Sequence, residues 1–177
     1  MPGFAGITDV YKTDLGAHMV GPQSEGERIT VQGRIFDGAE DLVTDAMVEI
    51  WQADHQGNFA SGLEARGQSF SGWGRQPTDA QTGIFKFETI KPGRVAWSDG
   101  RLQAPFISVW IVARGINLGL HTRMYFADED AANAQDPVLQ MLTNPARRST
   151  LIAARRKDTY LFDINLQGEN ETIFFDI

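Results

Sequence analysis

The side chains that could bind a metal ion through an imidazole or a phenol are three histidines and three tyrosines. They are His18, His55, His121, Tyr11, Tyr125 and Tyr160. His121 and Tyr125 stand four residues apart in a segment that alternates like a strand. A strand rises about 3.3 Å per residue, so these two side chains start about 13 Å apart, too far to close on one ion. His18 and His55 have no neighbour at ligand spacing, and we interpret them as surface histidines.

Three successive carboxylates, Asp128, Glu129 and Asp130, form the only dense acidic run. Calcium loops place their ligands at alternate positions with a glycine at the bend, which this run lacks. We therefore interpret it as a solvated connection between a strand and a helix. Cysteine is absent, which excludes disulfides and thiolate sites. The glycine-rich motifs of serine hydrolases, nucleotide sites and dinucleotide sites are also absent.

Arg114 is the polar residue that stands out. It ends the apolar run from Phe106 to Ala113 and is followed by Gly115, where the backbone can bend. A guanidinium at the edge of a buried strand needs a partner, because an unpaired buried charge is costly. Two partners remain open: an acidic residue of the same chain, or the carboxylate of a ligand held by a two-pronged hydrogen bond.

Composition narrows the class of protein. A chain of 177 residues with 42% hydrophobic and 22% charged residues predicts one globular domain. The net charge of -7 argues against nucleic-acid and anionic-membrane partners. The start has no basic or apolar leader region, and the longest apolar run is far shorter than the roughly 20 residues of a spanning helix. We expect a soluble, cytoplasmic protein.

Alternating hydrophobic residues predict strands along most of the chain. The predicted strands cover 28–36, 45–54, 83–90, 106–113, 120–126, 159–167 and 171–177. In the first, Ile29, Val31, Gly33 and Ile35 share one face. The continuous apolar run 106–113 predicts a strand buried on both faces.

Other segments predict loops and helices. Asp136 and Asn144 are each followed by proline, the pattern of a helix N-cap and first residue, so two short helices are expected. Residues 1–26 predict an arm or loop with one turn of helix near 10–15, and residues 55–81 a long loop. The arginine pairs at 147–148 and 155–156 are interpreted as solvated helix charge. The pattern as a whole predicts an all-β fold, a β-sandwich with long loops, over residues 27–177.

Seven segments together resemble the intradiol dioxygenase family, and within it the α chains of its two-chain enzymes. They are EIWQAD (49–54), FSGWGR (70–75), TIKPG (89–93), ARGIN (113–117), LHTRMYF (120–126), DPVLQML (136–142) and FDINLQGENETIFFDI (162–177). The resemblance runs from about Glu27 to the C-terminus. It implies a β-sandwich enzyme that cleaves protocatechuate between its hydroxylated carbons with O2, using Fe(III) held by two tyrosines and two histidines.

The same resemblance implies that this chain lacks those ligands. The histidine pair of the iron-bearing β chains falls on Phe106 and Ser108, and one ligand tyrosine falls near Val95. No tyrosine lies between Lys12 and Met124 to serve as the other. The resemblance therefore implies a non-catalytic α subunit, with Fe(III) in the partner β chain and none bound here.

For Arg114, the resemblance implies contact with the substrate carboxylate in a pocket shared with the β chain. The family's α chains begin with an arm whose Gly-Pro also lines that pocket. Gly21-Pro22 is out of register with it, so we expect this chain to start after the arm. Two alternatives stay open: a free-standing β-sandwich binding or assembly module, and an independent enzyme whose metal site uses His121 or His55.

Overall fold

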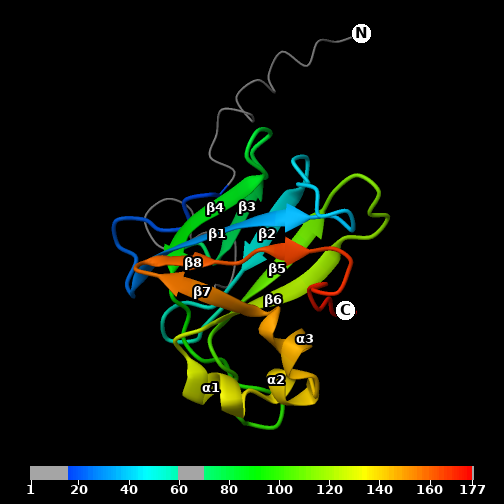
Figure 1. Cartoon of the computed structure of the whole chain (residues 1–177). Coiled ribbons are helices and arrows are strands. Elements are labelled where there is room, and N and C mark those ends of the chain that lie inside the picture. The colour runs from blue at the N-terminus through cyan, green and yellow to red at the C-terminus, as the bar shows by residue number, and fades with distance from the viewer. Residues whose placement is uncertain (1–15, 60–69, 177) are drawn as a thin grey trace.

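The computed structural model describes residues 16–59 and 70–176. Within these residues the chain forms nine strands and three short helices (Figure 1). The strands are β1 (Arg28–Phe36), β2 (Met47–Trp51), β3 (Trp73–Pro77), β4 (Ile84–Ile90), β5 (Phe106–Val112), β6 (Leu120–Phe126), β7 (Ile152–Arg156), β8 (Thr159–Leu161) and β9 (Ile164–Asn165). The helices are α1 (Asp130–Gln135), α2 (Pro137–Met141) and α3 (Pro145–Ser149).

The strands follow the order β3-β2-β5-β6-β7-β8-β1-β4, with β9 paired to β1. β7 joins the two halves of this sheet, because it pairs in parallel with β6 and antiparallel with β8. Inward side chains from both halves form one core, in which Val31 and Phe87 lie with Val48 and Ile107. The all-β architecture predicted from the alternation is confirmed, and the sandwich is built from one sheet that folds over itself.

The middle strand β5 has one face in the core and one face that points outward. Along β5, Ile107, Val109 and Ile111 point into the core and are at most 2% exposed. The alternate residues lie on the opposite, outward face, and Val112 at the end of β5 is 45% exposed. The prediction of a strand buried on both faces therefore holds only at its start, because the helices cover only that end of the sheet (Figure 1).

The covered end forms a second apolar cluster under α1 and α2. Its buried members come from β5 and the segment before it, from β6, from α1 and α2, and from segments after the helices: Ala104, Phe106, Tyr125, Ala132, Leu139, Leu151 and Ile173. Both predicted helix starts are confirmed. The side chain of Asp136 accepts from the amides of Val138 and Leu139, and Asn144 does the same for Ala146 and Arg147.

Four predictions of secondary structure were wrong. A third helix, α1, begins at the last residue of the acidic run, where only two helices were expected. The expected loop 55–81 contains β3, and the arginines at 155–156 lie in β7 rather than in a helix. Residues 171–176 are not a strand, although the amide of Phe175 donates to the carbonyl of His121.

The turn of helix expected near 10–15 falls outside the described residues. Within those residues, no helix has the length and apolar character needed to cross a membrane.

Candidate functional site

The sheet register places Phe106 and Ser108 on the outward face of β5. Phe106 pairs with Tyr125 of β6, and Ser108 pairs with Arg123 of β6 and with Trp51 of β2. Residues two apart on a strand share a face at a separation of about 6.6 Å, which would suit a pair of ligands for one ion. The geometry of a metal-binding pair is thus present without the metal-binding side chains.

Phe106 is packed into the second apolar cluster. It is 6% exposed, and its ring centroid lies 6.1 Å from that of Tyr125. The guanidinium of Arg123 lies over the same ring, 4.3 Å from the centroid. Val95 packs against the same cluster. The fold therefore brings the positions predicted at 95 and 106 together as packing residues, with Ser108 next along the strand.

The residues at this face do not fit ferric iron. Val95 and Phe106 offer no donor atom, and Ser108 offers only a hydroxyl. Burial raises the pKa of Tyr125 well above its usual range, and the phenol donates to the carboxylate of Asp136 at 3.3 Å. Tyr125 is therefore held as a neutral phenol. In residues 16–59 and 70–176, no group of three or more histidines, cysteines or carboxylates could hold a metal ion.

Arg123 is the residue of this face that was not predicted from the sequence. Its Nη1 donates to Oε1 of Gln103 at 2.8 Å, and Gln103 is itself only 4% exposed. The backbone amide of Gln103 donates to the carbonyl of Val95 at 2.8 Å. An arginine at an outward position of a strand two residues before Tyr125 was the available signal, but its partners come from a distant segment.

Arg114 lies in the connection between β5 and β6, not at a buried edge. Its side chain is 90% exposed and forms an ion pair with Asp45. The buried position expected for it was wrong, because β5 already emerges into solvent at Val112. Of the two partners considered for Arg114, the structure contains the acidic residue of the same chain, Asp45. Ser108 lies four residues, about 13 Å, before the last residue of β5, and Arg114 lies two residues beyond that end, so the two residues are separated along the strand.

The histidines do not converge on a common site. His121 and Tyr125 lie on β6 with Arg123 between them, and the imidazole of His121 faces Phe175 with ring centroids 6.1 Å apart. Burial, and then the charge of Arg123, lower the pKa of His121, so its neutral form is favoured. His18 lies 3.4 Å from Glu88 and His55 lies 3.6 Å from Glu25. A metal site built on His121 or His55 has no support in the described residues.

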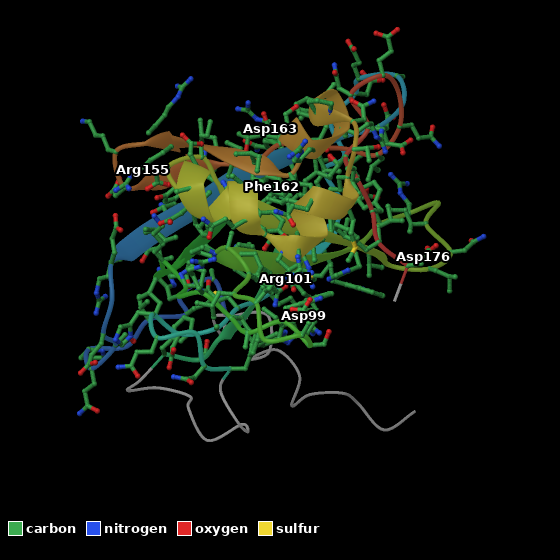
Figure 2. All side chains as sticks on the ribbon, turned by 90° about the horizontal axis from the view of Figure 1, so that it is seen from below. Asp99, Arg101, Arg155, Phe162, Asp163 and Asp176 are labelled. Atoms are coloured by element: carbon green, nitrogen blue, oxygen red, sulfur yellow. The ribbon has the colours of Figure 1, made fainter. Side chains whose placement is uncertain are left out.

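The acidic run after β6 forms ion pairs rather than a cation site. Asp128 accepts from Lys91 at 2.9 Å, from Arg155 at 2.5 Å and from the phenol of Tyr160 at 3.0 Å. Arg155, at one margin of the molecule (Figure 2), also pairs with Glu27 at 2.6 Å. The network ties β7 and β8 to the segments that precede β1 and follow β4 and β6.

Asp128 should make the fold sensitive to acid. Burial would raise the pKa of Asp128, but hydrogen bonds from Lys91, Arg155 and Tyr160 outweigh it and hold the pKa at about 2. Because this value lies below the unfolded value of 3.8, the stabilisation is present above pH 3.8 and is lost as the pH falls through about 2. We expect Asp128→Asn to lower the melting temperature at pH 7 by about 2–4 °C, for a partly buried network worth about 1 kcal/mol.

The measurement is thermal unfolding of parent and variant between pH 7 and pH 2. The difference between them should shrink below pH 4. Asp130→Asn is the matched control, since Asp130 belongs to the same acidic run and starts α1, while the described ion pairs of the run are made by Asp128 and Glu129. A difference that stays constant down to pH 2 would contradict the assignment.

Known proteins share both the sequence and the fold. The family model described as Dioxygenase matches residues 1–168. The protocatechuate 3,4-dioxygenase α chain of Pseudomonas putida is 44% identical, covering 88% of this chain and 79% of that one. The β chain of the Burkholderia cepacia enzyme is 32% identical, covering 94% of this chain and 81% of its own.

Solved structures agree with this sheet arrangement. The dioxygenase domain of a dioxygenase carbohydrate-binding protein fusion from Streptomyces sp. SirexAA-E has a TM-score of 0.61 at 25% identity, covering 91% of this chain and 90% of that one. Catechol 1,2-dioxygenase from Pseudomonas arvilla C-1 has a TM-score of 0.62 at 22% identity, covering 88% and 57%. The fold, the family model and the identity to α chains lead to one conclusion: this chain belongs to the intradiol ring-cleavage dioxygenase family.

Proposed function

We propose that this chain is the non-catalytic α subunit of a protocatechuate 3,4-dioxygenase and that the Fe(III) is held by its partner β chain. The observation that carries the proposal is the packing of Phe106. A ligand position filled by a buried phenyl ring, flanked by Val95 and capped by the guanidinium of Arg123, offers no donors to iron. A chain of this family without the ligands needs a partner that has them.

We assign Arg114 to the substrate pocket of that partner. It lies beyond the end of β5, away from Phe106 and Ser108. Its guanidinium is 90% exposed, so it can reach across an interface. Protocatechuate carries a carboxylate, for which a guanidinium is the matching planar donor. Ring cleavage would be supplied by the iron of the β chain with O2, while Arg114 holds the far end of the substrate in a productive orientation.

The cellular assignment rests on the sequence. We place the α/β complex in the cytoplasm; the chain has no cysteine and therefore no disulfide, which is compatible with that compartment. The acidic net charge of -7 does not oppose an anionic substrate, since one local cation decides the contact.

Co-expression with the β chain of a related enzyme tests the proposal. We expect a stable hetero-oligomer with equal numbers of α and β chains, one iron per αβ pair and ring-cleaving activity on protocatechuate. The chain expressed alone should bind no iron and show no activity, as measured by elemental analysis and O2 uptake. A stable monomer that does not bind the β chain would favour the free-standing binding or assembly module. One iron per chain in the isolated protein would overturn the proposal.

A further inference from the structure

Arg123 lies at the centre of the three positions where iron ligands are replaced. Its guanidinium covers Phe106, and its backbone pairs with Ser108 across β5 and β6. Its hydrogen-bond partner Gln103 is fixed to the carbonyl of Val95. Each of the three positions therefore touches Arg123 or the residue that holds it.

The guanidinium of Arg123 is fixed in place, and the phenol of Tyr125 separates it from the carboxylate of Asp136, to which that phenol donates. The side chain is half-buried, and its contacts in residues 16–59 and 70–176 are with the neutral groups of Gln103, Phe106 and Tyr125 rather than with a carboxylate in a direct ion pair. On the same sheet face Arg75, which stacks on Trp73, is by contrast paired with Glu49. A guanidinium stays protonated at every pH a folded protein tolerates. The outward face of β5 thus carries a permanent positive charge at its covered end.

Such a charge opposes a metal ion at this face. Side chains at 106 and 108 would hold an ion within a few ångströms of the guanidinium that now covers the ring of Phe106. Repulsion between two cations at that separation is large in a partly buried, low-dielectric setting and is weakly screened by salt. The guanidinium is also anchored by Gln103, which limits how far it can withdraw.

We propose that Arg123 is a specificity-determining residue that excludes metal ions from this chain independently of the lost ligands. The inference rests on the proposed function only in treating 106 and 108 as former ligand positions. Restoring two histidines would then be insufficient for metal binding while Arg123 is present. The absence of ligand side chains and the positive charge of Arg123 would each, separately, prevent metal binding.

The test uses the full chain, Ni2+ as the probe and isothermal titration calorimetry. The variant Phe106→His/Ser108→His should bind Ni2+ no more tightly than the parent, whose own histidines set the background. Adding Arg123→Met to this variant should increase the affinity about 100-fold, because the charge is gone while the apolar stem remains. Adding Arg123→Lys should leave the affinity low, because the charge is kept.

Arg75→Met in the same double-histidine variant is the matched control and should leave the affinity unchanged. Thermal unfolding and near-UV circular dichroism identify variants that fold, and Arg123→Gln is a second neutral replacement if the methionine variant does not. The proposal is overturned if the double-histidine variant already binds as tightly as the Arg123→Met form, or if Arg123→Lys and Arg123→Met bind equally well. No β chain is present, so either result leaves the proposed α/β function untouched.

Discussion

Arg114→Ala in the α/β complex is expected to lower kcat/KM for protocatechuate by about 10- to 100-fold. A hydrogen bond between charged groups contributes about 1.5–3 kcal/mol, and each 1.4 kcal/mol is a factor of ten. Loss of the guanidinium removes both the attraction for the carboxylate and the orientation it provides. Because the Arg114 side chain is 90% exposed, the variant should fold and assemble as the parent does. Steady-state O2 uptake by the purified complex measures the effect.

Two controls separate substrate contact from a structural salt bridge. With catechol, which has no carboxylate, the parent and Arg114→Ala complexes should give equal kcat/KM. Asp45→Asn removes the intrachain partner of Arg114 and should maintain or increase the affinity for protocatechuate. Arg156→Ala, at another exposed arginine on β7, should have no effect. If Asp45→Asn reproduces the loss seen with Arg114→Ala, the arginine acts through its salt bridge and not on the substrate.

The strands that the sequence predicts well are those with one buried face and a clean alternation. β1 and β6 have the predicted bounds because every second residue enters the core. Gly33, at a core position of β1, is explained by the structure, since a side chain there would collide with the carbonyl of Phe162. Local pattern and tertiary packing agree at these positions.

The elements that were missed depend on partners far away in the sequence. Arg155 of β7 lies in a segment whose sequence predicts solvent-exposed charge. In the structure Arg155 pairs with the carboxylates of Glu27 and Asp128. β3 contains Gly74, which the close approach of Gly16 requires. Neither partner is visible in a local pattern, so neither strand could be predicted from periodicity.

The residues of the candidate site also fall into two groups, those predicted from the sequence and those found only in the structure. The resemblance to the family predicts that 95, 106 and 108 are replaced ligand positions, because the segments around them match the family in order and spacing. It did not identify Arg123 or Gln103, whose importance follows from the register of β5 against β6 and from one side-chain hydrogen bond. The contacts of Arg123 and Gln103 are found from the packing rather than from a motif.

Asp136→Ala is expected to have the largest effect on stability. Asp136 is fully buried and accepts four hydrogen bonds, from the amides of Ala104, Val138 and Leu139 and from the phenol of Tyr125. Alanine leaves these donors without a partner, and each buried donor costs about 1–3 kcal/mol. We expect a loss of about 3–5 kcal/mol and a melting temperature lower by about 10 °C. Urea unfolding at pH 7 measures the loss directly.

Asn144→Ala provides the matched comparison because both residues cap a helix that starts with proline. Asn144 accepts from Ala146 and Arg147 at an exposed position, so its removal should cost about 1 kcal/mol, the value of an ordinary cap. The difference between the variants measures what Asp136 adds by joining α2 to the start of β5 and to Tyr125. Equal losses would show that Asp136 is only a cap. A larger loss at Asp136 follows from burial, which the shared Asx-Pro pattern cannot reveal.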